Sequence, residues 1–253
     1  MPFNKEHADF YAENGYVVVE GIVSREDLIK VRERMEEVQN RMLEALAARK
    51  AGSQSGYMVE GGSGTAVAPR PVLRKLSELA SADPLLRRIA STPDILDAVS
   101  ALTGGGRRIM LYEDQVFLKP AFCGSEKPLH QDNSYFKLTP NSAGVTCWMA
   151  LDDATVENGC MHYIPGSHKL GLIGHKQIKD TPHLVPDGSV KLNAEVPVPI
   201  PAGACIFHHL LCLHSSKANT SPHPRRAYAL HYANRDATQS CMRPWSKMLA
   251  LRE

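Results

Sequence analysis

The sequence lacks the features that mark membrane, nucleic-acid-binding or secreted proteins. No stretch approaches the roughly eighteen consecutive apolar residues of a membrane-spanning helix, and the N-terminal segment has no apolar signal core. The charges nearly cancel, with 29 Lys and Arg against 27 Asp and Glu, so the chain has no strongly basic field for a phosphate backbone. We therefore expect a cytoplasmic protein that binds a small molecule and neither a membrane nor a nucleic acid.

The chain also lacks paired cysteine motifs. Its six cysteines are scattered from Cys123 to Cys241 without a Cys-x-x-Cys pair. This pattern favours reduced, mostly buried thiols over a disulfide framework or a thiolate metal site. The length of 253 residues fits one domain, which we expect to span 1–253.

The first 106 residues are expected to be mainly helical, with one loop. Ser24 can cap a helix in which apolar residues recur with helical spacing from Leu28 to Leu46. The Gly- and Ser-rich segment from Gly52 to Gly64 predicts a loop that closes over substrate as a lid. Shorter helices are predicted at 71–79, 84–89 and 93–102, the last beginning with Pro93.

The pattern changes after the glycines at 104–106 to short apolar runs separated by turns. Many short strands with turns between them predict an all-β core over 107–235, closed or built from two sheets, with the helices as a buttress. The candidate strands are 109–112, 115–119, 131–137, 145–151, 160–164, 195–198, 204–208, 211–215 and 226–232.

A His-x-Asp triplet lies in the segment PLHQDNSYF, at 128–136. Side chains two residues apart in a strand point to the same side, so His130 and Asp132 can face one point. His214, near the end of a later apolar strand, can supply a third ligand. Two histidines and one carboxylate on one face of iron(II) leave positions open for cosubstrate and O2. We therefore predict iron(II) bound by these three residues.

Arg225 follows His214 by eleven residues, across a turn rich in Pro and Asn. A guanidinium held deeper in the barrel than the metal can grip a carboxylate through two parallel hydrogen bonds. This arrangement would hold the far carboxylate of 2-oxoglutarate. Neighbouring strand residues point to opposite faces, so Arg226 is expected to face solvent or the helices. His208 and His209 are rival metal ligands, but neither has an arginine at the same offset.

Four ordered motifs resemble the phytanoyl-CoA dioxygenase family of 2-oxoglutarate-dependent oxygenases, from near the N-terminus to residue 232. They are FYAENGYVVVEGIVS, FLKPAFCGSEKPLHQDNSYF, TCWMALDDATVENGCMHYIPGSHK and IPAGACIFHHLLCLHSSKANTSPHPRRAYALHY. The resemblance implies a double-stranded β-helix, the cupin-like jelly roll, with flanking helices. It assigns iron to His130, Asp132 and His214, and the distal oxoglutarate carboxylate to Arg225.

The same resemblance implies further contacts to the cosubstrate, and for some of them an alternative stays open. Trp148 is either such a contact or an ordinary core residue, and Arg74 competes with Lys75 for the same role. The residues that match positions at which the family contacts 2-oxoglutarate are Trp148, Ser216, Gln115 and Lys75.

The implied activity is hydroxylation of an unactivated C–H bond of a small organic substrate by iron(II), 2-oxoglutarate and O2, with release of succinate and CO2. Related halogenases have a small residue in place of the carboxylate ligand, so the presence of Asp132 favours hydroxylation. Desaturation by the same cofactors and a metal-binding sensor without turnover are the alternatives. No residue identifies the substrate, and the oligomeric state is not indicated.

Overall fold

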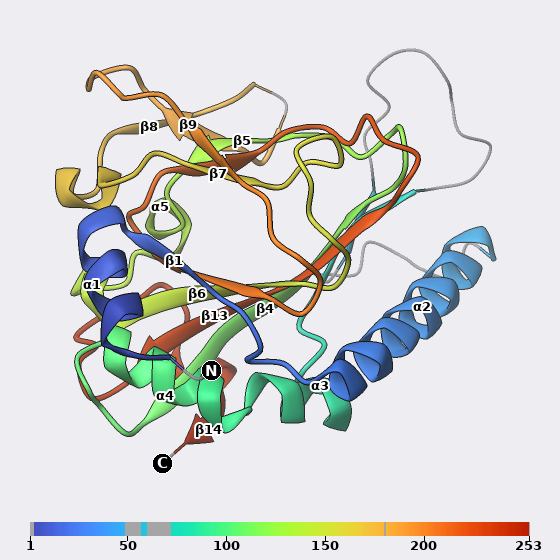
Figure 1. Ribbon diagram of the computed structural model, residues 1–253, viewed down its shortest axis with the longest axis horizontal. Helices are drawn as coiled ribbons and strands as arrows, with labels where there is room; N and C mark the ends of the chain where they lie inside the picture. Colours follow the sequence, from blue (N-terminus) through green and yellow to red (C-terminus); the bar gives the residue numbers. More distant parts are fainter. Residues whose placement is uncertain (1–2, 49–56, 60–71, 180, 253) are drawn as a thin grey trace.

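Two antiparallel sheets face each other in the computed structural model, which describes residues 3–48, 57–59, 72–179 and 181–252 (Figure 1). In the main sheet, β14 (Leu249–Arg252) pairs with one side of β4 (Ile109–Lys119). The other strands of this sheet are, in spatial order, β1 (Tyr16–Val19), β11 (Cys205–His209), β6 (Gly144–Ala150), β13 (Arg225–Asn234), β4 (Ile109–Lys119), β3 (Leu73–Ser77) and β2 (Tyr57–Val59).

The second sheet is smaller and lies above the main sheet in the view of Figure 1. Its spatial order is β10 (Val196–Val198), β7 (Met161–Tyr163), β12 (His214–Ser216) and β5 (Lys127–His130). A separate hairpin is formed by β8 (His175–Gln177) and β9 (Leu184–Pro186). The predicted jelly-roll core is confirmed as a pair of sheets; the described strands do not close into one continuous barrel.

Helices cover the outer face of the main sheet, as the buttress prediction requires (Figure 1). Ser24 caps α2 (Arg25–Ala47) by accepting a hydrogen bond from the backbone N–H of Asp27, and Pro93 is the first residue of α4 (Pro93–Leu102), as predicted. No helix within the described ranges is long and apolar enough to cross a membrane. The helices are α1 (Lys5–Asn14), α2 (Arg25–Ala47), α3 (Pro84–Ala90), α4 (Pro93–Leu102), α5 (Asn133–Phe136) and the 3₁₀ turns Asn141–Ala143, Ser167–Leu170 and Trp245–Lys247.

The apolar core has two main parts. The larger part joins α2, α3 and α4 to the outer face of the main sheet and includes Met35, Ile89 and Val99, which are almost fully buried. A second part lies between the two sheets and includes Tyr163 and Ile206. The helices therefore fix the main sheet from behind, and its inner face is left for the functional site.

The expectation of a mainly helical first 106 residues is wrong in one respect, because β1 and β3 belong to the main sheet. The predicted helix at 71–79 is instead strand β3. The spacing of Leu73 and Leu76 resembles a helical period, but the backbone of this segment pairs with β4 through Lys75 and Phe117. Most of the predicted loop from Gly52 to Gly64 lies outside the described residues; 57–59 form β2.

Two strand predictions are also corrected. The runs at 109–112 and 115–119 form one continuous strand, β4, because buried Asp114 accepts hydrogen bonds from the backbone of Ala80 and the hydroxyl of Tyr228. The predicted strand at 131–137 is absent. Strand β5 ends at His130, and the chain then turns into the short helix α5.

Candidate active site

A cavity of about 330 Å³ lies where strands of both sheets meet. The residues predicted from the sequence to bind metal or cosubstrate all line this one cavity. They are His130, Asp132, His214, Arg225, Ser216, Trp148, Gln115 and Lys75, and Arg74 lines the cavity as well.

Strand pairing brings the two predicted histidine ligands together. His130 ends β5 and His214 begins β12, and the two residues are register partners in an antiparallel pair. Their ring centroids lie 4.2 Å apart. The two imidazoles therefore reach the cavity from neighbouring strands of the small sheet.

Asp132 lies beside the two histidines, but its backbone is not in the strand that the sequence predicted. Its backbone is α-helical, and its carbonyl accepts hydrogen bonds from the N–H groups of Tyr135 and Phe136 in α5. The Oδ1 atom lies 3.6 Å from Nε2 of His130 and 3.6 Å from Nε2 of His214. The ligand atoms of the three residues all lie within 4.8 Å of one another, so they can hold one metal ion.

The tautomers of both histidines follow from their hydrogen bonds. Nδ1 of His130 lies 2.8 Å from the carbonyl oxygen of Pro128, and Nδ1 of His214 lies 2.9 Å from that of Cys212. A carbonyl only accepts, so each Nδ1 carries the proton and donates. Each Nε2 therefore keeps a lone pair on the side of Asp132, as a metal-binding imidazole requires.

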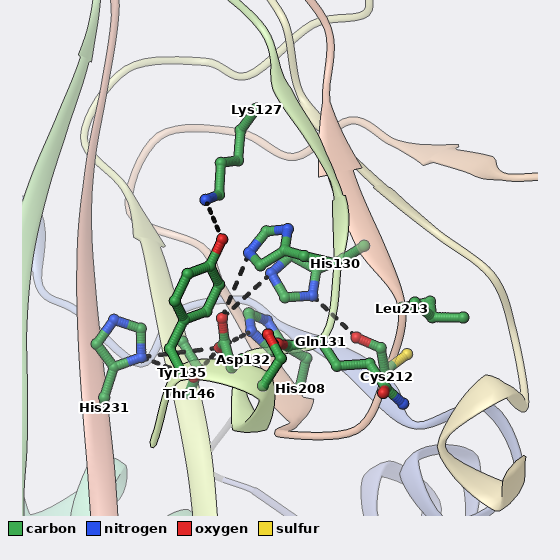
Figure 2. A network of polar contacts seen from close by, with 12 residues as sticks. Lys127, His130, Gln131, Asp132, Tyr135, Thr146, His208, Cys212, Leu213 and His231 are labelled. Carbon is green, nitrogen blue, oxygen red and sulfur yellow. Dashed lines mark hydrogen bonds and ion pairs between the residues drawn. The ribbon is translucent and has the colours of Figure 1, made fainter. Parts of the chain in front are cut away.

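The other oxygen of Asp132 is held by two side chains of the main sheet (Figure 2). Thr146 donates to Oδ2 at 2.7 Å, and Nε2 of His208 donates to the same oxygen at 3.0 Å. His208 is oriented in turn by the hydroxyl of Tyr163, at 2.9 Å from Nδ1, and Thr146 contacts Nδ1 of His231 at 2.8 Å. With Oδ2 occupied, Oδ1 is directed to the two histidines.

Burial and charge keep the predicted ligands in the protonation states that bind a metal. Burial lowers the pKa of both His130 and His214, which favours neutral imidazoles. Burial opposes the ionisation of Asp132, but its interactions with the surrounding histidines, including the hydrogen bond donated by His208, hold its pKa well below the usual value. Two neutral imidazoles and one carboxylate are the donor set that iron(II) takes in facial-triad sites.

Arg225 is a buried cation without a carboxylate partner among the described residues. Its side chain is 1% exposed, and Nη2 donates to the carbonyl of Gly159 at 3.1 Å. Its Nε and Nη1 atoms find no acceptor in the described part of the chain. Burial lowers its pKa to about 10, and its guanidinium carbon lies 5.3 Å from the ring centre of Trp148. Nε and Nη1 of Arg225 are therefore available to donate hydrogen bonds to an anion in the cavity.

Arg226 points to the opposite side of β13, as strand alternation predicts. Its side chain donates to both carboxylate oxygens of Asp152, each at 2.9 Å, and to Glu36 of α2 at 2.9 Å. The predicted division between an inward Arg225 and an outward Arg226 is therefore confirmed.

The positions of the rival histidines show what the sequence analysis missed. His208 lines the cavity and contacts Asp132, and it is not one of the three residues grouped around a metal position. His209, next to it on β11, accepts a hydrogen bond from the N–H of Leu211. The supporting roles of His208, Thr146 and His231 were not predicted. The sequence signal for them was alternation in the strands that became β6, β11 and β13, which places polar side chains on an inner sheet face.

Known proteins resemble this chain in sequence. The family model described as phytanoyl-CoA dioxygenase (PhyH) matches residues 11–227. The peroxisomal phytanoyl-CoA dioxygenase of Bos taurus is 30% identical over 247 residues, which cover 90% of this chain and 68% of that protein.

Solved structures share the fold. The non-haem, alpha-ketoglutarate-dependent carbocyclase SnoK of nogalamycin biosynthesis is 26% identical with a TM-score of 0.68; the match covers 92% of this chain and 84% of SnoK. The epimerase SnoN, solved with Fe3+, alpha ketoglutarate and nogalamycin RO, is 24% identical with a TM-score of 0.66. That match covers 91% of this chain and 83% of SnoN.

Proposed function

The chain belongs to the phytanoyl-CoA dioxygenase family of 2-oxoglutarate-dependent non-haem iron oxygenases, and we propose that it hydroxylates an unactivated C–H bond of a small organic substrate. Its cofactor is iron(II), and its cosubstrates are 2-oxoglutarate and O2. In the proposed assignment, His130, Asp132 and His214 bind iron through Nε2, Oδ1 and Nε2. Their donor types, mutual distances and hydrogen-bonded tautomers support it.

The observation that carries the proposal is the unpaired guanidinium of Arg225. A fully buried cation is costly unless an anion compensates it, and no described carboxylate does so. We assign the distal carboxylate of 2-oxoglutarate to Nε and Nη1. Trp148 lies beside this guanidinium, and Ser216, Gln115 and Lys75 line the same cavity, so each is a candidate for a further cosubstrate contact.

When bound, iron(II) and 2-oxoglutarate activate O2, and one oxygen atom goes to the substrate while the other enters succinate as CO2 is released. The protein's own contribution is positioning. Arg225 fixes the depth of the cosubstrate, and Thr146 with His208 fixes the orientation of the Asp132 carboxylate. The two facing sheets keep most of the site from water, which strengthens these interactions.

The test is a screen of candidate small molecules for substrate-stimulated succinate release, with the mass of each product measured. Hydroxylation predicts one added oxygen per succinate formed. A product that has lost two hydrogens would identify desaturation. A protein that binds iron and 2-oxoglutarate but releases no succinate with any candidate would favour a binding module and contradict the proposal.

A further inference from the structure

Lys127, at the beginning of β5, is another cation that lines the same cavity. Lys127 is three residues before His130, is half-buried, and points to the hydroxyl of Tyr135 (Figure 2). Its Nζ lies 3.2 Å from that oxygen and 3.2 Å from Nδ1 of His183. Two of the three ammonium protons are thereby used, and no described residue accepts the third.

Tyr135 offers a second unused donor at the same place. Its oxygen accepts from Lys127 and also from the backbone N–H of Leu184, at 2.8 Å. Both lone pairs of the hydroxyl are therefore occupied, and its own proton must point elsewhere. No acceptor for that proton is present in the described ranges. One N–H of Lys127 and the O–H of Tyr135 are therefore without an acceptor among the described residues, and the Tyr135 ring centroid lies 5.9 Å from that of His130.

The charges that line the cavity are unbalanced. Five cationic side chains and two carboxylates are among the described lining residues, which is a formal excess of three positive charges. Iron(II) and doubly charged 2-oxoglutarate cancel each other and leave that excess unchanged. The cations are Arg74, Lys75, Lys119, Lys127 and Arg225, and the carboxylates are Glu113 and Asp132.

The cosubstrate does not account for Lys127. 2-Oxoglutarate has two carboxylates. The distal one is assigned to Arg225, and the other belongs to the 2-oxo acid end that binds iron. Lys127 lies on β5 of the small sheet, whereas Arg225 begins β13 of the main sheet. Burial lowers the pKa of Lys127 to about 8; the charge of Asp132 opposes this shift, and the charges of Arg74 and Lys75 add to it. A further anion beside Lys127 would therefore stabilise its ammonium.

We propose that Lys127 and Tyr135 bind a carboxylate of the substrate, so that this enzyme oxidises small organic acids. The inference rests on the proposed function and adds the chemical class of substrate. The ammonium and the phenol each donate one hydrogen bond to the carboxylate, and Arg74 and Lys75 add attraction without direct contact. The substrate is thereby held beside His130, which places the carbons near the carboxylate closest to the iron.

Binding of acids and their uncharged analogues, without turnover, tests this inference. Anaerobic protein loaded with iron(II) and 2-oxoglutarate would be titrated in a calorimeter with straight-chain acids from butanoate to octanoate. The matched primary amides and phosphonates would be titrated in parallel. We expect at least one acid to bind roughly tenfold or more tightly than its amide, because the charge-assisted hydrogen bonds are lost in the amide.

Variants of Lys127 and Tyr135 test whether these two residues cause the preference for acids over amides. Lys127→Met should remove the preference for the acid, and Tyr135→Phe should weaken it, while 2-oxoglutarate binding stays at the wild-type value. Lys176→Met, which removes an exposed lysine on β8, is the matched control and should keep the preference. Retention of 2-oxoglutarate binding also shows that each variant is folded.

Three outcomes would overturn the inference: no acid binds better than its amide, the Lys127-dependent preference is for the phosphonate, or Lys127→Met weakens 2-oxoglutarate instead. The 2-oxoglutarate titration of the wild-type protein separates the two proposals. If 2-oxoglutarate itself does not bind, the proposed function fails. If it binds and acids show no preference, only the substrate class fails.

Discussion

Nε2 of His208 lies 3.0 Å from Oδ2 of Asp132, so a residue of the main sheet orients a carboxylate that follows a strand of the small sheet. Thr146 donates to the same oxygen from β6. The predicted metal ligand is therefore held from the opposite sheet, and the distance between the two sheets affects the geometry of the site.

This relationship predicts that His208 supports metal binding without being a ligand. Loss of a hydrogen bond to a ligating carboxylate typically weakens metal binding by roughly 10- to 100-fold. His208→Leu should show a loss of this size in an anaerobic iron(II) titration, and His208→Gln, which can still donate, should lose less. The control is His209→Gln on the same strand. If His208→Leu binds iron as tightly as the wild type, the positioning role is wrong.

Removing the predicted anionic ligand should have a larger effect. Asp132→Ala leaves two neutral imidazoles, so we expect iron content to fall far below one per chain and substrate-stimulated succinate release to fall to background. Metal analysis and a succinate assay measure the two effects. Asp187→Ala, at an exposed aspartate after β9, should match the wild type. Wild-type turnover and iron content in Asp132→Ala would show that the ligand assignment is wrong.

A prediction about stability concerns the outward arginine. Asp152 accepts hydrogen bonds from the side chain and from the backbone N–H of Arg226, and both side chains are 16% exposed. Asp152→Ala should lower the free energy of unfolding by about 2 kcal/mol, the usual contribution of hydrogen bonds to charged groups.

Denaturant titration measures this loss, and the exposed pair of Lys5 and Asp9 provides the comparison. Asp9→Ala should cost less than about 0.5 kcal/mol, because solvent screens an exposed pair. Equal losses in Asp152→Ala and Asp9→Ala would contradict the structural role of Asp152.

Much of the architecture could be predicted from local patterns. The cap at Ser24, the first helical position at Pro93 and the opposite directions of Arg225 and Arg226 depend on neighbouring residues and were confirmed. Strand β3 was missed because its identity depends on pairing with β4, which is distant in the sequence.

In the site, too, features set by neighbouring residues could be predicted, and features set by distant contacts could not. The predicted residues line one cavity, although the strand geometry assumed for Asp132 was wrong. The chain leaves the strand after His130 because Asn133 makes hydrogen bonds outside the strand. Its N–H donates to the carbonyl of Leu210, and its side-chain amide donates to the carbonyl of Leu138 and accepts from the N–H of Leu138. These partners lie outside the His-x-Asp triplet, so the triplet could not reveal the turn. The support from His208 likewise depends on the packing of two sheets.

The central claim is that this cavity binds iron(II) with 2-oxoglutarate, with Arg225 holding the distal carboxylate. The most direct measurement is an anaerobic titration of 2-oxoglutarate into iron(II)-saturated wild-type, Arg225→Ala and Arg226→Ala proteins, followed by the visible charge-transfer band; zinc should give no band. Loss of a guanidinium that pairs with a buried carboxylate costs on the order of 2 to 5 kcal/mol. Arg225→Ala should therefore raise the dissociation constant by roughly thirtyfold or more, and Arg226→Ala should leave it near the wild-type value. A large defect confined to Arg226→Ala, or no band in the wild-type protein, would contradict the account.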